Sequence, residues 1–124
     1  MKKLAKITSA TLEIKERDIL SFWIYVDYEE FGSQGIGGFT LDTFDKEKNK
    51  RVGTAYGCEM IRRILNTLGV NDFSEMKGSI IWVYGTGERL NFKPTGIQSL
   101  NVSGLKNTPL IFSDVYNEFF SEKP

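Results

Sequence analysis

A cluster of glycines marks the place where the backbone itself could bind a ligand. Gly32, Gly35, Gly37 and Gly38 are four of the twelve glycines of the chain, and they fall within seven residues. Glycines gathered in this way are typical of positive φ angles, of a bulge, or of a ligand or second backbone that approaches closely. Their amides could therefore hold an anion such as a phosphate.

The surrounding pattern argues against the known phosphate-binding loops. A dinucleotide fingerprint needs a strand, a G-x-G-x-x-G turn and a helix in immediate succession, whereas residues 39–41 here are typical of a short strand. No Gly-Lys-Ser/Thr ending is present either. We expect a bulge or a tight sheet crossing in the glycine segment, residues 32–38, and keep an anion-binding loop as the alternative.

A second candidate site is the start of a predicted helix. Thr54 lies between Gly53 and Ala55 and suits a helix N-cap, and the free amides that follow could receive a phosphate or carboxylate. Gly57 lies in the first turn, where glycine costs about 1 kcal/mol relative to alanine unless something packs closely against it. We predict that the glycine segment lies against residues 53–57, with any binding site at their junction; a neighbouring chain is the alternative.

Few side chains could do chemistry. The chain has no histidine and one cysteine, Cys58, which excludes the common zinc sites, histidine-based triads and an internal disulfide. We interpret Cys58 as a packing residue. The carboxylates Asp27, Glu29, Glu30 and Asp42 flank the glycine segment and could act as an acid–base pair, but no EF-hand spacing or Asp-x-Asp cluster accompanies them. We predict no catalytic residue, no metal and no cofactor.

The composition is that of one domain without net charge. The 124-residue chain carries 16 basic and 16 acidic residues, and 40% of its residues are hydrophobic. A chain of this length can bury a core, and the lack of a basic excess argues against a nucleic-acid partner. No apolar run approaches a membrane span, and no apolar stretch follows the basic start, as it would in a signal peptide. We expect a soluble protein in the cytoplasm of a host cell, with no membrane partner.

Two strands are predicted at residues 6–14 and 20–28, joined by the charged turn 15–18. In the second strand, Trp23 and Tyr25 fall on the face opposite the apolar residues 20, 22, 24 and 26. We expect a second packed face there, because large aromatic side chains are usually buried. The alternative is an aromatic surface offered to a partner.

The clearest element is a helix over residues 55–68, with Thr54 as N-cap and Gly69 just past its end. Its outer face carries Arg62 and Arg63 together with Glu59, at spacings that favour ion pairs; a role in ligand binding is the alternative. The charged residues 42–51 before it are predicted to form a solvated, mobile loop.

The rest of the chain predicts more strands and a second helix. A turn at residues 72–76 precedes a central strand at 79–84, a hairpin partner at 89–93 and a further strand at 97–102. Thr108 and Pro109 start a short amphipathic helix near the end. We predict an α+β fold with a single domain over residues 1–124, an antiparallel or mixed sheet of about five to six strands, and one long helix packed on it.

Several motifs of the chain resemble those of a family of small phage and prophage proteins without an established activity. They are the G-S-Q-G-I-G-G segment at residues 32–38, the G-T-A-Y-G helix start at 53–57, the paired arginines of the helix, and a Lys-Gly at 77–78. The resemblance covers residues 6–84, and the last third departs from the pattern of the family. What it implies is a small accessory gene of a phage or mobile element.

The leading hypothesis is therefore a non-enzymatic accessory protein that inhibits or modulates a host defence system. It would bind a host protein complex or sequester a nucleotide ligand, and act as a homo-oligomer. The alternatives are a small metal-dependent enzyme acting on a nucleotide or nucleic acid, and a nucleic-acid-binding module. The residues expected to contact the ligand or partner are Gly32, Ser33, Gln34, Gly35, Gly37, Gly38, Thr54, Tyr56, Arg62, Arg63, Trp23 and Tyr25.

Overall fold

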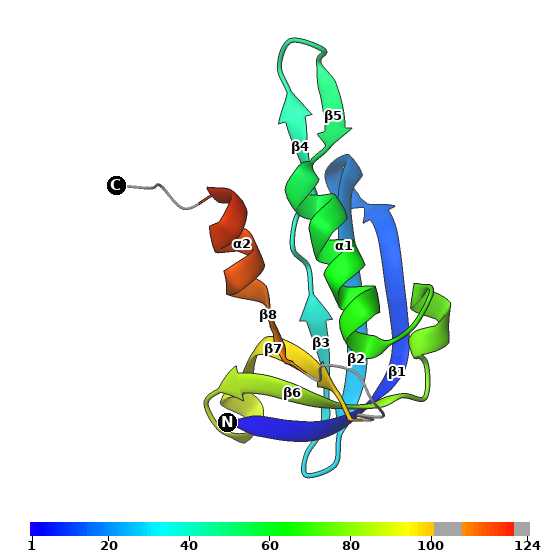
Figure 1. Ribbon diagram of the computed structural model, residues 1–124, viewed down its shortest axis with the longest axis vertical. Helices are drawn as coiled ribbons and strands as arrows, with labels where there is room; N and C mark the ends of the chain where they lie inside the picture. The colour runs from blue at the N-terminus through cyan, green and yellow to red at the C-terminus, as the bar shows by residue number, and fades with distance from the viewer. Residues whose placement is uncertain (101–107, 121–124) are drawn as a thin grey trace.

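The computed structural model describes residues 1–100 and 108–120 (Figure 1). Its strands are β1 (Lys2–Lys15), β2 (Ile19–Tyr28), β3 (Ser33–Gly37), β4 (Asp42–Asp45), β5 (Lys50–Gly53), β6 (Ile80–Thr86), β7 (Lys93–Ser99) and β8 (Leu110–Ile111). Its α-helices are α1 (Ala55–Leu68) and α2 (Phe112–Phe120), and three short 3₁₀ helices are η1 (Glu16–Asp18), η2 (Phe73–Met76) and η3 (Arg89–Asn91).

Six of these strands form one antiparallel sheet in the order β3-β2-β1-β6-β7-β8, and β4 and β5 form a separate two-stranded sheet. A register shift between Ile7 and Ser9 divides β1. Its first part pairs with β6 across the base of the molecule, and its second part runs upward beside β2 (Figure 1). The long bent strand thus joins both halves of the sheet. The six-stranded sheet together with the two helices confirms the predicted α+β fold.

The core lies between one face of this sheet and the two helices. Phe22, Ile24 and Val26 of β2 point into it and are fully buried, as the alternation of the sequence predicts. Phe112 of α2 contacts Phe22, with ring centroids 6.2 Å apart, so α2 covers the same face of the sheet as α1. No helix in the described residues is long and apolar enough to cross a membrane.

Helix α1 has the predicted bounds because its caps are local. The Thr54 hydroxyl accepts a hydrogen bond from the Gly57 amide at 2.9 Å, and Gly69 ends the helix in the left-handed conformation with φ of 69°. Met60 and Ile64, one turn apart, are fully buried against the sheet. Helix α2 is the predicted C-terminal helix, but the predicted start at Thr108 and Pro109 is wrong: residues 110 and 111 form the strand β8, and the helix begins at Phe112.

The glycine segment differs from its prediction as a bulge or tight crossing, because it contains a regular edge strand. β3 pairs with β2 from Trp23 opposite Gly37 to Asp27 opposite Ser33, whereas residues 39–41 form no strand. The rings of Trp23 and Tyr25 extend from β2 over the position where a Cβ of Gly35 would lie, at 3.1 to 3.2 Å. The missing side chains therefore make room for the aromatic rings of the neighbouring strand.

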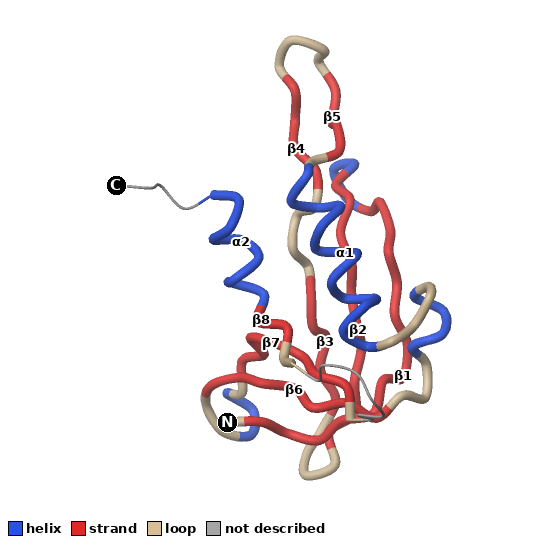
Figure 2. Tube along the Cα trace, viewed as in Figure 1, coloured by secondary structure: helices blue, strands red, loops and turns tan. Residues whose placement is uncertain are grey.

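The charged stretch 42–51 is mostly exposed, as predicted, but it does not form the predicted loop. It forms the hairpin β4–β5, which projects beyond the first turn of α1 (Figure 2). Arg51 binds both carboxylate oxygens of Asp42 across the hairpin, at 2.7 and 3.0 Å, and Asp45 accepts the amides of Glu47 and Lys48 in the turn. Charged side chains of this stretch therefore form hydrogen bonds within the hairpin.

Two further predictions need correction in the last third. The hairpin partner of β6 is β7, which begins only at Lys93, because residues 89–91 form η3. β7 ends at Ser99, and the remainder of the predicted strand 97–102 reaches residues outside the described part of the chain.

Leu41 joins the sheet to α1. Its amide donates to the Leu20 carbonyl of β2 at 2.9 Å, and its carbonyl accepts a hydrogen bond from the Thr54 hydroxyl at 2.6 Å. A Cβ on Gly57 would lie 1.9 Å from the same carbonyl oxygen, and the three atoms nearest to that position all belong to Leu41. The close neighbour of Gly57 is therefore Leu41, three residues past Gly38, rather than the glycine segment itself.

The contact predicts an unusual effect of alanine at position 57. In an ordinary helix interior, glycine to alanine stabilises by about 1 kcal/mol. Here the added methyl group meets the Leu41 backbone, so we expect Gly57→Ala to destabilise the protein by about 2 kcal/mol or more. Chemical denaturation measures the difference.

Gly53→Ala is the matched control, because a Cβ there has no neighbour within 4 Å. Its free energy of unfolding should stay within about 0.5 kcal/mol of the wild type. A Gly57→Ala protein as stable as the wild type would contradict the close contact.

Candidate functional site

Four aromatic side chains from α1 and α2 form a partly exposed cluster, which we call the aromatic surface: Tyr56, Tyr116, Phe119 and Phe120. Tyr56 makes a T-shaped contact with each of the other three rings, with centroid distances of 5.8, 6.0 and 5.2 Å. Tyr56 itself is buried, but Tyr116, Phe119 and Phe120 are 52%, 41% and 50% exposed. The three rings on α2 therefore expose apolar surface to solvent, although each of them also contacts the ring of Tyr56.

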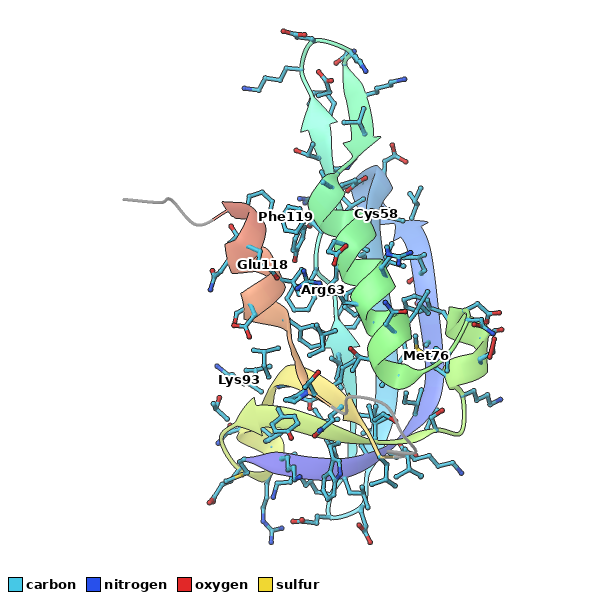
Figure 3. The ribbon with its side chains drawn as sticks, in the orientation of Figure 1. Cys58, Arg63, Met76, Lys93, Glu118 and Phe119 are labelled. Atoms are coloured by element: carbon cyan, nitrogen blue, oxygen red, sulfur yellow. The ribbon has the colours of Figure 1, made fainter. Side chains whose placement is uncertain are left out.

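Helix α2 is held in place at both ends. At its start, β8 pairs with β7, and Phe112 and Val115 are buried in the core. Near its end, Glu118 binds the Arg63 guanidinium of α1 with both oxygens, one of them 3.0 Å from Nη2 (Figure 3). Arg63 also donates from Nε to Glu59 at 2.6 Å, so one guanidinium connects both helices.

The ion pair orients α2 more than it stabilises it. The hydrogen bonds that Arg63 donates to Glu118 and, to a smaller extent, to Glu59 raise the pKa of Arg63, and the guanidinium lowers the pKa of the Glu118 carboxyl. Because the Arg63 and Glu118 side chains are 32% and 51% exposed, water and salt screen this attraction. Burial, with a smaller contribution from Tyr116, raises the pKa of Tyr56, so its hydroxyl stays neutral at pH 7.

Two hollows border the aromatic surface, and Tyr56 lines both. The inner hollow, of about 300 Å³, lies between the two helices and β7; its lining is Phe39, Tyr56, Pro94, Thr95, Phe112, Ser113 and Tyr116. The outer hollow, of about 330 Å³, lies at the start of α1; its lining is Asp42, Thr43, Thr54, Ala55, Tyr56, Phe119 and Phe120. Both are at the small end of the range of ligand sites.

The start of α1 is poorly suited to an anion. The Thr54 hydroxyl already accepts the Gly57 amide, and the Cys58 amide donates to the Thr54 carbonyl at 3.1 Å. Asp42 lines the outer hollow, and its hydrogen bond with Arg51 lowers the pKa of its carboxyl, so it is charged at pH 7. A phosphate there would lie beside a carboxylate whose arginine is already engaged.

Trp23 and Tyr25 lie on the other face of the sheet, away from the aromatic surface. Their rings are nearly parallel, at 15° with centroids 6.0 Å apart, and they lie over Gly35, while Trp23 also covers Gly38. Tyr25 is 38% exposed and Trp23 is half-buried. The glycine segment packs against these two rings, but neither ring belongs to the core and Tyr25 is exposed, so the prediction of a second packed face there is wrong.

The remaining residues of the glycine segment take part in the fold. Gln34 accepts the Tyr28 hydroxyl at 2.5 Å and donates to the Phe92 carbonyl at 2.9 Å, which ties β3 to the residue before β7. Ser33 donates to Asp27 at 2.5 Å on the exposed side. Gly37 has φ of 135° and packs against the Phe22 carbonyl. Gly32 is exposed and its carbonyl accepts the Tyr28 amide at 2.9 Å, but an added Cβ there would have no neighbour within 4 Å.

The structure separates the other predicted site residues. Arg62 is exposed on α1, whereas Arg63 faces α2, and Cys58 is exposed rather than packed. Asp27 binds Ser33 and Asp42 binds Arg51, so these carboxylates are not gathered at one place. Within residues 1–100 and 108–120, no group of three or more His, Cys, Asp or Glu side chains could hold a metal ion.

Of the predicted site residues, only Tyr56 belongs to the aromatic surface, and Thr54 lies beside it on the outer hollow. The spacing of Phe112, Val115, Tyr116 and Phe119 predicts the buried stripe of a helix, but only the first two are buried. A signal was present in the aromatic content: Phe119 and Phe120 are adjacent, so a single helix cannot bury both on one narrow stripe.

Comparisons of the chain with protein-family models, with curated proteins and with solved structures found no match.

The burial of the Tyr28 hydroxyl predicts a loss of stability at high pH. Burial raises the pKa of Tyr28 from 10.0 to about 12. The folded protein therefore keeps this proton more tightly than the unfolded chain, and the stabilisation is complete below pH 10 and is lost as the pH rises toward 12. We expect a loss of about 2 kcal/mol over this interval in urea unfolding.

Tyr28→Phe is the control, since it cannot ionise. It should be less stable than the wild type at pH 8 by about 1 kcal/mol, because the Gln34 oxygen loses its donor. This order should reverse as the pH rises from 10 toward 12, because the wild type loses about 2 kcal/mol that the variant cannot lose. Parallel stability curves across this range would contradict the assignment.

Proposed function

We propose that the protein is a non-enzymatic binding protein that occupies a surface of a partner protein through the aromatic surface of α1 and α2. The observation that carries this proposal is the ring cluster around Tyr56, three members of which are 41% to 52% exposed. Tyrosine and other large aromatic side chains dominate the energetic centres of protein interfaces. They contribute large contact areas with few rotatable bonds.

The charges around the site favour a protein partner over a nucleotide. None of the seven residues that line the inner hollow is charged, and the charged residue of the outer hollow is Asp42. A nucleotide phosphate would favour a nearby cation, and no lysine or arginine is among the residues that line the two hollows. The alternative of a metal-dependent enzyme receives no support from the scattered carboxylates of the described residues.

The biological setting of the proposal comes from the resemblance of the sequence to small phage and prophage proteins. In that setting, a protein of this kind would act inside a bacterial host by occluding a component of a defence system. Occlusion requires a partner-binding surface and no turnover, which agrees with the character of the aromatic surface. A homo-oligomer remains part of the proposal.

Substitution of the exposed phenylalanines tests the proposal. Phe119→Ser/Phe120→Ser removes two rings of the aromatic surface without opening the core, because both are 41% or more exposed. The proteins are expressed in bacterial hosts that each carry one defence system, and phage plating efficiency is measured. We expect the wild type to restore plating on at least one host. On that host, the plating efficiency with the double variant should be at least tenfold lower than with the wild type.

Leu90→Ser is the control, because this side chain is 95% exposed, lies in η3 and lines neither hollow. It should restore plating as the wild type does. Melting curves of all three proteins verify that they fold. No effect of the wild type on any host would refute inhibition of defence, and full activity of the folded double variant would refute the role of the aromatic surface.

A further inference from the structure

The inner hollow has a chemical character that narrows what it could hold. Aromatic rings of Phe39, Tyr56, Phe112 and Tyr116 form most of its wall, together with the ring of Pro94. Phe39 and Phe112 contact one another at 5.2 Å between centroids, which fixes the floor of the hollow against the core. An apolar group placed there would exchange water for aromatic carbon on several sides.

Besides the two tyrosines, two residues with aliphatic hydroxyls line the hollow, Thr95 and Ser113, and both are exposed. Thr95 stands at an irregularity of β7: Gly96 pairs with Tyr84 and Pro94 pairs with Gly85, so Thr95 is left without a partner in the β6–β7 register. Bulges of this type re-aim a side chain and occur often beside binding sites. Here the bulge adds a hydroxyl to the lining of an otherwise apolar hollow.

We infer that the inner hollow receives one apolar side chain, aromatic or long aliphatic, from a peptide segment of the partner protein. This inference rests on the proposed function and names the chemistry of the partner group. The ring walls contact the side chain, and the hydroxyls of Thr95 and Ser113 bond the polar backbone of the peptide. The uncharged lining disfavours a phosphate or a charged side chain, which would lose water without gaining an ion pair. Anchor residues that fill such pockets dominate interface affinity.

The test uses small amides that carry one side chain. N-acetyl-tryptophanamide and N-acetyl-leucinamide are titrated into the full-length protein, with AMP as the charged comparison, and binding is followed by amide NMR spectra. We expect saturable shifts for an amide probe at Thr95, Phe112, Ser113 and Tyr116, and none there for AMP. Ser113→Leu fills the hollow and should weaken binding of the amide at least tenfold.

Asn117→Leu is the matched control, because it adds the same side chain to an exposed position of α2 that does not line the hollow. It should bind the amide probes as the wild type does. The inference is overturned if neither amide shifts the hollow, if Ser113→Leu binds as tightly as the wild type, or if AMP saturates the same residues. If Ser113→Leu loses amide binding and still restores phage plating, the hollow is not the partner's anchor site, while the proposed function stands on the Phe119→Ser/Phe120→Ser result.

Discussion

The docking of α1 on the sheet depends on one backbone carbonyl. Leu41 is fixed to β2 through its amide, and its carbonyl binds the Thr54 hydroxyl and contacts Gly57. A side chain at position 57 would push the helix away from this carbonyl. Because Tyr56 precedes Gly57, the same contact sets the position of the ring around which Tyr116, Phe119 and Phe120 gather. A glycine that weakens an isolated helix thus determines where the aromatic surface forms.

Local signals made part of this fold predictable. The bounds of α1 follow from a threonine cap, a terminal glycine and helical spacing, all of which lie within the helix and its neighbours. The alternation of apolar residues in β2 likewise predicts which face of the strand is buried. The glycine segment could not be assigned from local pattern, because β3 depends on the rings of Trp23 and Tyr25, which come from another strand. Likewise, the charges of residues 42–51 indicate solvation, but the Asp42–Arg51 pair forms only once the hairpin closes.

The candidate site could not be predicted from the sequence, because it too depends on contacts between distant segments. Tyr56 and the aromatic residues of α2 lie far apart in the sequence, and neither group alone shows more than helical spacing. The fold brings them together through β8 and the Arg63–Glu118 ion pair, and it leaves apolar rings at the surface where the sequence predicts a buried stripe. Such exposure of large apolar rings is the physical basis for proposing a binding role.

The central claim is that the Leu41–Gly57 contact organises the aromatic surface as well as α1. Hydrogen–deuterium exchange of wild type, Gly57→Ala and Gly53→Ala under native conditions tests it most directly. The account predicts faster exchange of both α1 and α2 in Gly57→Ala, with β1 and β2 still protected and Gly53→Ala unchanged. Faster exchange of α1 alone, with α2 protected as in the wild type, would contradict it.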